Sequence, residues 1–291
     1  MNTHQRSCRI FLNYVATVLS LSLIGLSIVQ AEVASTSRTG ASHSNHPGTL
    51  QKVLEKGTLR VGVSLFTPWT LKNKDGQLVG FEIDVAKQLA KDLGVQPEFH
   101  VFDWENIVPA LLKREIDIIA AGMVITPQRA LKVNFSQPYD SSGIGLVTNT
   151  SLTKTFQGPQ DLNRSEVVLT AVTGTVAEGL ARRVFPKATI KTFASSQEAI
   201  QAVISGKVHG YVEHAPITTF VALDNPKTVD EPLSKPLLET KAGFAVIKGD
   251  PDFINFLNAW IISHNADVWL TSAHKYWFGS LDWRADTGNT P

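Results

Sequence analysis

Short apolar stretches alternate with amphipathic stretches along this chain, and the alternation occurs in two blocks. Residues 58–64 place apolar side chains at every second position, as a half-buried strand does, while Val85, Leu89 and Leu93 recur at helical spacing. Strands that alternate with helices form mostly parallel sheets with helices on their faces, so the pattern predicts an α/β fold. Further strands are expected at 98–102, 117–122, 167–172, 188–193 and 208–212, and further helices at 104–115, 175–185 and 195–206.

The two blocks predict two lobes that are joined at two places. The first lobe is expected to contain residues 49–146 together with the returning tail 243–285, and the second lobe residues 147–242. Two crossings between lobes form a hinge. Ligands of open parallel sheets bind beyond the carboxyl ends of the strands. We therefore expect a binding cleft between the two lobes.

The beginning of the chain differs from the rest. Two arginines precede an apolar run at 10–29 that ends in the small-residue pattern Val29-Gln30-Ala31, so residues 1–31 are predicted to be a cleaved secretory signal peptide. The alternative is a permanent membrane anchor, because the run is long enough to span a bilayer. Residues 32–48 are rich in Ser, Thr, Gly and Ala and predict a flexible leader.

Composition limits the chemistry that the exported part can perform. The only cysteine, Cys8, lies within the predicted signal peptide, which leaves no thiol for a disulfide, a nucleophile or a zinc site. His209, His264 and His274 have no metal-ligand spacing together, so we expect no metal and no cofactor. The net charge of +1 and the lack of a dense Lys/Arg stripe also argue against a nucleic-acid partner.

Two positions in the sequence favour the binding of an anion. Thr126-Pro127 has the form of a helix start and places Arg129 in the first turn, where its guanidinium can present paired donors to a carboxylate. The alternative is a surface arginine that pairs with a neighbouring acid. Gly174-Thr175 stands where a strand turns into a helix, and a helix N-terminus favours an anion. An ordinary helix cap is the alternative role for Thr175, and the two roles are compatible.

Three aromatic residues are candidates for the cleft. Phe66 and Trp69 follow the first strand, and Trp104 opens a helix. Aromatic faces supply apolar contact area and attract cationic ligand groups. The alternative for each is packing in the core, and Trp69 fits either place.

Several sequence strings follow one another in a specific order and spacing, at residues 59–63, 75–84, 104–111, 117–129, 135–139 and 174–175. In this order they resemble the bacterial extracellular solute-binding proteins of family 3, the polar amino-acid-binding components of ABC importers. The resemblance covers about residues 50–280. It implies a two-lobed periplasmic-binding-protein fold of type II. It also implies a monomer in the periplasm that closes on a small carboxylate-bearing ligand, such as an amino acid, and a membrane permease as partner.

The resemblance assigns roles at the carboxylate end of the site. It implies that Arg129 holds the carboxylate of the ligand and that the backbone at Ala121 and Gly122 donates to the same group. Thr175 would complete this clamp from the second lobe. Val124 departs from the pattern, because many relatives have Ser or Thr at this position. One hydrogen bond to the ligand must therefore come from elsewhere.

The other end of the site departs further from the family. Phe66 and Trp104 match the aromatic pair that sandwiches the ligand side chain. Relatives usually have an Asp, which pairs with the α-ammonium of the ligand, where this chain has His214 preceded by Glu213. Glu213 could supply the carboxylate through a bulge, a neutral His214 could accept from an amine, or the ligand could lack an α-ammonium. Strand alternation opposes the first of these, because adjacent side chains point to opposite faces.

Two rival functions are compatible with the resemblance. Some relatives are dehydratases that act on prephenate or arogenate and carry an acid near the position of Ile217, which cannot donate a proton. Glu213 is the only nearby acid that could replace it. The second rival is a ligand sensor, and because no transmembrane segment follows, only a free sensor is expected. We predict a transport protein without catalytic residues.

Overall fold

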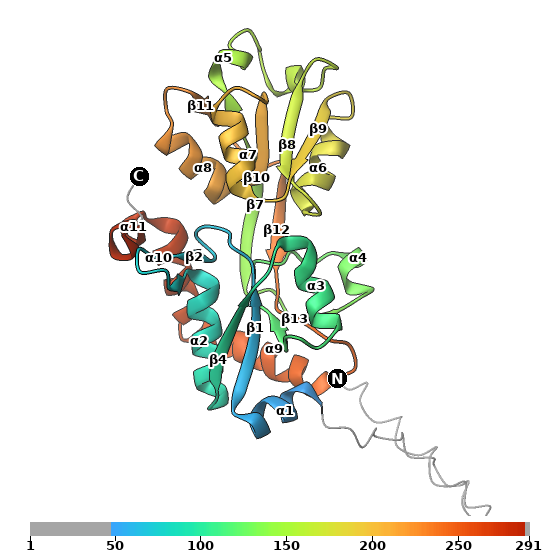
Figure 1. Cartoon of the computed structure of the whole chain (residues 1–291), viewed down its shortest axis with the longest axis vertical. Coiled ribbons are helices and arrows are strands. Elements are labelled where there is room, and N and C mark those ends of the chain that lie inside the picture. The colour runs from blue at the N-terminus through green and yellow to red at the C-terminus, as the bar shows by residue number, and fades with distance from the viewer. Residues whose placement is uncertain (1–47, 289–291) are drawn as a thin grey trace, which may run out of the picture. The chain divides into compact units, whose positions relative to one another are not determined.

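The computed structural model of the chain describes residues 48–288 and contains two large β-sheets with helices around them (Figure 1). The predicted signal peptide lies outside the described residues, as does the predicted leader except for Gly48. Within residues 48–288, no helix combines the length and the apolar character needed to cross a bilayer.

The first sheet contains β1 (Thr58–Val63), β4 (Gln96–Val101), β5 (Ile118–Ile119), β6 (Asn134–Phe135) and β13 (Ala245–Val246). Their spatial order is β4–β1–β5–β13–β6. β1 pairs in parallel with β4 and β5, whereas β13 is antiparallel to β5 and β6. The alternate side chains of β1, at Leu59, Val61 and Val63, are fully buried, as the apolar alternation predicted.

The helices that accompany the first sheet are α1 (Thr49–Lys56), α2 (Phe81–Leu93), α3 (Trp104–Leu112), α4 (Pro127–Ala130), α9 (Pro251–Ala266), α10 (Trp269–Gly279) and α11 (Asp282–Thr287). A short hairpin of β2 (Leu71–Lys72) and β3 (Leu78–Val79) precedes α2. α2 contains the three residues that recur at helical spacing, and it buries Val85 and Leu89 against the core. It ends at Gly94, whose φ of 71° is the left-handed conformation that favours glycine after a helix.

The second sheet contains β7 (Asp140–Asn149), β8 (Val168–Val172), β9 (Thr189–Phe193), β10 (Gly210–His214), β11 (Val229–Asp230) and β12 (Leu238–Ala242). The order is β11–β7–β10–β8–β9, and β12 also pairs with β7. β8 is parallel to β9 and β10, while β7 is antiparallel to β10, β11 and β12. The accompanying helices are α5 (Thr150–Thr153), a 3₁₀ turn (Pro159–Leu162), α6 (Val176–Val184), α7 (Ser196–Ile204) and α8 (Ala215–Asp224).

β7 and β12 connect the two sheets. The chain leaves the first sheet after β6 to form β7, and it returns from β12 to β13. The two connecting strands lie side by side, with Ile144 opposite Leu238, and both run between the two groups of elements in Figure 1. Two mixed sheets, each with three neighbouring parallel strands and flanking helices, confirm the predicted α/β fold class. The predicted lobe boundary after residue 146 falls inside β7, and the division into lobes stays a prediction.

Candidate functional site

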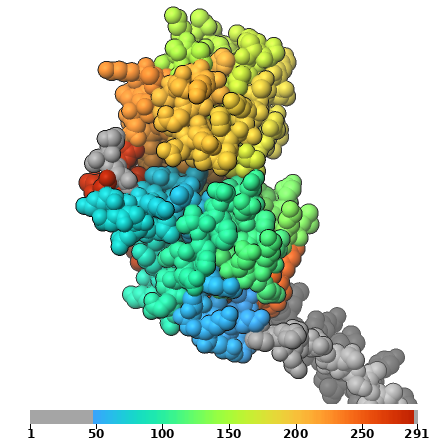
Figure 2. All heavy atoms as spheres, viewed as in Figure 1, coloured from blue at the N-terminus to red at the C-terminus, as the bar shows by residue number. Residues whose placement is uncertain are grey.

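A cavity of about 180 Å³ lies at the carboxyl ends of strands from both sheets. The first sheet contributes residues that follow β1, β4 and β5, and the second contributes residues at the ends of β8 and β10. In Figure 2 this is the boundary where the yellow segment near residue 195 meets the blue-to-green segments near residues 65 and 103. Every predicted site residue except Trp69 and Gly174 lines the cavity. Its volume is below the roughly 300–1,000 Å³ of drug-sized sites, which favours a small ligand.

Arg129 is held in the cavity by its own helix start. The Thr126 hydroxyl accepts from the Arg129 backbone N–H at 3.2 Å, as the predicted cap requires, and the Arg129 Nη1 donates to the Val124 carbonyl at 2.8 Å. The guanidinium carbon lies 5.3 Å from the centre of the Trp104 ring. Burial lowers the pKa of Arg129 to about 10, which leaves the side chain charged at neutral pH. Within residues 48–288 no carboxylate pairs with Arg129, so the alternative of a surface ion pair is not supported.

The Gly122 amide does not serve the role that the resemblance implied. Its N–H donates to the buried Glu82 carboxylate at 2.6 Å, so the protein itself occupies this donor. Tyr139 Oη lies 2.8 and 2.7 Å from the two Glu82 oxygens. Burial raises the pKa of Glu82 to about 8, with a further upward contribution from Asp140, while the hydrogen bonds from Tyr139 and Gly122 oppose the rise. The expectation that Gly122 donates to the ligand is therefore wrong for this structure.

The backbone amide that is available to a ligand near Arg129 belongs to Val124. Val124 faces Ala242 in an isolated antiparallel bridge, and the hydrogen bonds of this bridge come from the neighbours, Ile125 N–H to the Lys241 carbonyl and Gly243 N–H to the Met123 carbonyl. In such a pair the central N–H points away from the partner strand. Among the described residues the Val124 N–H has no acceptor, and Val124 lines the cavity. Val124 lacks the hydroxyl that Ser or Thr would supply, but its backbone N–H is still available as a donor to the ligand.

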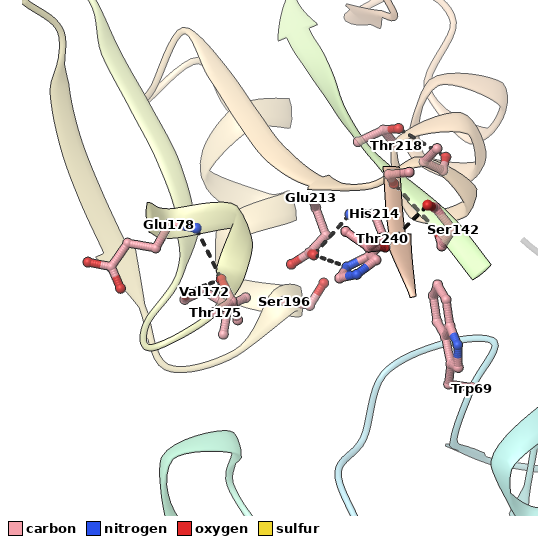
Figure 3. A network of polar contacts seen from close by, with 12 residues as sticks. Trp69, Ser142, Val172, Thr175, Glu178, Ser196, Glu213, His214, Thr218 and Thr240 are labelled. Carbon is pink, nitrogen blue, oxygen red and sulfur yellow. Dashed lines mark hydrogen bonds and ion pairs between the residues drawn. The ribbon is translucent and has the colours of Figure 1, made fainter. Parts of the chain in front are cut away.

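Thr175 caps the helix that faces the cavity from the second sheet. Its hydroxyl accepts from the Glu178 N–H at 3.2 Å and donates to the Val172 carbonyl at 2.7 Å (Figure 3). Thr175 therefore performs the ordinary capping role, and it also lines the cavity. Gly174 itself does not line the cavity. Its φ is 74°, and its N–H donates to the Glu178 carboxylate at 2.8 Å. The Gly174 carbonyl accepts from Trp104 Nε1 at 3.4 Å.

Glu213 and His214 both line the cavity, although strand alternation predicted opposite faces. The reason is that β10 ends at His214, which is the residue before α8, so the backbone no longer continues as a strand there. The His214 Nδ1 lies 2.7 Å from Glu213 Oε1, which also accepts from the His214 backbone N–H at 2.9 Å (Figure 3). Tyr211 donates to the other Glu213 oxygen at 3.0 Å and contacts the Ser196 hydroxyl at 2.8 Å. Only 1% of Glu213 is exposed, so a buried carboxylate stands at this end of the cavity.

Trp69 belongs to the core rather than to the cavity surface. It is 2% exposed, and its Nε1 donates to Asp140 Oδ2 at 2.9 Å. Its ring stacks on Phe66 at 4.8 Å between centroids and meets the His214 ring at 5.6 Å. Figure 3 shows Trp69 next to His214. Of the two places that the sequence left open for Trp69, the structure shows the core and not the cleft, and its ring supports Phe66 and His214, which do line the cavity.

The sequence reasoning missed Glu82, although the sequence carried a signal for it. Glu82 lies three and seven residues before Val85 and Leu89, on the stripe of α2 that faces the core. An acid on a buried stripe needs internal hydrogen bonds, which here come from Tyr139 and Gly122. No comparable signal identified Ser196, because its contact with Tyr211 joins two separate elements. Within the described residues, no group of three or more His, Cys, Asp or Glu side chains is arranged to hold a metal ion.

Comparison with known proteins assigns the class. The family of bacterial extracellular solute-binding proteins, family 3, matches residues 59–280. The chain belongs to this family, as the resemblance of its sequence strings indicated.

Similar proteins include binding proteins and an enzyme. The chain is 28% identical over 237 residues to the L-cystine-binding protein TcyJ of Escherichia coli (strain K12), which covers 80% of this chain and 87% of that protein. It is 27% identical over 181 residues to the cyclohexadienyl dehydratase of Pseudomonas aeruginosa, with 62% of this chain and 68% of that enzyme covered.

Solved structures give the same picture. The crystal structure of the ancestral amino acid-binding protein AncCDT-1, described as a precursor of cyclohexadienyl dehydratase, matches with a TM-score of 0.72 and 36% identity over 80% of this chain and all of that one. A binding component of an ABC transporter from Wolinella succinogenes, complexed with lysine, matches with a TM-score of 0.74 and 33% identity over 78% of this chain and 98% of that one.

Proposed function

We propose that this protein binds an amino acid in the periplasm and delivers it to the permease of an ABC importer. The observation that carries the proposal is that a cationic and an acidic side chain line the same small cavity. Among the described residues Arg129 has no carboxylate partner, and Glu213 is a buried carboxylate. A zwitterion complements both groups at once.

The carboxylate of the amino acid would lie between Arg129 and the start of α6. Arg129 supplies charge-assisted hydrogen bonds, and the Val124 N–H supplies a backbone donor on the same side. Thr175 and Val176 line the cavity at the positive end of the α6 dipole. These donors replace the Gly122 amide, which Glu82 occupies.

The ammonium group would lie at Glu213. Of the three alternatives for this end, we favour a carboxylate from Glu213, because His214, which also lines the cavity, already directs its Nδ1 to Glu213. Tyr211 and the backbone and ring of His214 hold the carboxylate in place. A ligand ammonium would add a charged partner to these hydrogen bonds.

A thermal-shift screen of the mature protein tests the proposal, because a ligand that binds only the folded state raises the apparent stability. The panel contains the standard L-amino acids, matching 2-oxo acids that lack the ammonium group, and matching amines that lack the carboxylate. Amino acids should raise the melting temperature, whereas both sets of truncated compounds should have little effect. Equal stabilisation by the 2-oxo acids would refute the role of Glu213.

Closure and delivery follow from the same proposal. Residues 49–146 with 243–285 and residues 147–242 would act as two lobes that close around the ligand, with β7 and β12 as the hinge. Stimulation of the ATPase of the cognate importer by the ligand-loaded protein tests delivery. A ligand-loaded protein that never stimulates an importer would instead fit a free sensor.

A dehydratase is the second candidate, because one similar protein is a cyclohexadienyl dehydratase. Among the described residues, two acids line the cavity, the exposed Asp103 and the buried Glu213, and either could transfer a proton, whereas Ile217 is apolar and 5% exposed on α8. Incubation with prephenate or arogenate decides between the two functions. Rapid product formation that is lost in Glu213→Gln would overturn the transport proposal.

A further inference from the structure

Between its two charged ends, the cavity has an apolar wall. Leu65 and Phe66 follow β1, and Val101 and Phe102 lie at the end of β4. Val176 faces them from the start of α6. A ligand that contacts both Arg129 and Glu213 therefore also meets hydrocarbon and aromatic surface, together with the hydroxyls of Ser64, Ser195 and Ser196.

In the proposed complex, Arg129 and Glu213 already pair with the carboxylate and the ammonium of the ligand. Glu213 would hold the ammonium, and the other carboxylate in the lining, Asp103, is exposed to water, which weakens its pairing with a ligand. One face of the Trp104 ring is occupied by the Arg129 guanidinium at 5.3 Å. A second cation beside this ring would be repelled by Arg129. A cationic ligand side chain thus finds no buried partner of opposite charge.

Two large apolar side chains of the wall are exposed. Leu65 is 50% exposed and Val101 is 44% exposed, and both line the cavity. A ligand side chain that covers them removes apolar area from water, and the gain is proportional to that area. A charged side chain would lose part of its own hydration at the same place.

We infer that the ligand is an amino acid with an uncharged, apolar or aromatic side chain, which covers the wall formed by Leu65, Phe66 and Val101. This inference rests on the proposed amino-acid-binding function and assigns its ligand class. The inferred ligand class differs from the lysine that is bound in the similar protein from Wolinella succinogenes.

Calorimetric titration of the mature wild-type protein tests the class directly. The probes are L-phenylalanine, L-leucine, L-glutamine, L-lysine and L-arginine. Phenylalanine or leucine should bind at least about tenfold more tightly than lysine and arginine, because a charge gains no partner on the apolar wall. Tighter binding of lysine, arginine or glutamine would overturn the inferred class and leave the proposed function intact. Binding of none of the five, together with no hit among the remaining amino acids, would overturn both.

A matched pair of variants at Val101 tests the wall itself. Val101→Asp and Val101→Asn differ by one charge at a position that is 44% exposed, so both should fold. If the ligand side chain lies along this wall, the Asp variant should bind lysine about two- to fivefold more tightly than the Asn variant, as expected for a partly exposed ion pair. Equal lysine affinity of the two variants would show that the side chain lies elsewhere and would overturn the inference.

Discussion

The two ends of the cavity differ in how they are built. At the carboxylate end, Arg129 lies in a short helix that its own neighbours start, with Thr126 as the cap. At the ammonium end, Glu213 and His214 lie where β10 stops, and the carboxylate is held by Tyr211 from the same strand. The contacts that orient Arg129 lie within five residues, whereas the place of Glu213 depends on where β10 ends in the folded sheet. A local motif therefore orients Arg129, while the tertiary structure decides where Glu213 stands and which backbone donors beside Arg129 stay free.

Among the variants that test this comparison, the one that removes the Arg129 guanidinium should have the largest effect on ligand affinity. Arg129→Ala should lower ligand affinity at least about 100-fold, because charge-assisted hydrogen bonds contribute about 1.5–3 kcal/mol each. Isothermal titration with the best ligand of the screen measures the loss, and thermal unfolding should change little. The control is Arg183→Ala, which removes an exposed arginine from α6 outside the cavity. Unchanged affinity in Arg129→Ala would exclude Arg129 from the site.

The buried acid behind the carboxylate end should be visible in the pH dependence of stability. Burial raises the pKa of Glu82 from its ordinary 4.5 to about 8, so the unfolded chain releases this proton at lower pH than the folded chain does. The contribution of Glu82 to stability should therefore fall as pH rises from about 4.5 to about 8, by at most about 1.4 kcal/mol per pH unit. Glu82→Gln should flatten this slope in denaturant unfolding, whereas exposed Glu115→Gln should not. Parallel slopes for wild type and Glu82→Gln would contradict the shifted pKa.

The ammonium end is tested by a substitution that keeps its size. Glu213→Gln should lower the affinity for the best amino acid about 10- to 100-fold, because a buried charge-assisted pair is lost. It should also reduce the discrimination between that amino acid and its 2-oxo analogue, which titration of both compounds measures. Glu239→Gln, on the exposed side of β12, is the control. If Glu213→Gln still discriminates fully between the amino acid and its 2-oxo analogue, a group other than Glu213 binds the ammonium.

The aromatic side chain between the two ends should have the smallest effect. Trp104→Ala should weaken binding roughly tenfold through lost contact area, without a change in head-group preference. Titration with an amino acid and its 2-oxo analogue measures both quantities. Trp269→Ala on α10 removes an indole of the same half-buried class outside the cavity. A change of head-group preference in Trp104→Ala would show that the ring, whose centre lies 5.3 Å from the Arg129 guanidinium carbon, also positions the charge that selects the head group.

Sequence reasoning predicted the two sheets and nine of the nineteen residues that line the cavity, because apolar periodicity and helix caps act over short distances. It failed where a distant residue decided the outcome. Gly122 was expected to donate to the ligand, but its acceptor is Glu82, forty residues earlier in the chain. Trp69 was left open between the cleft and the core, and Asp140 holds its indole in the core.

The amino-acid sequence by itself determined the α/β class, the helix start that places Arg129, and the family to which the chain belongs. Only the tertiary structure decided which donors stay free for a ligand and which carboxylate stands opposite Arg129. The physical reason is that a hydrogen-bond donor or a charge is available only if no other part of the folded chain pairs with it. Such pairing joins residues that are far apart in sequence, as Glu82 and Gly122 show.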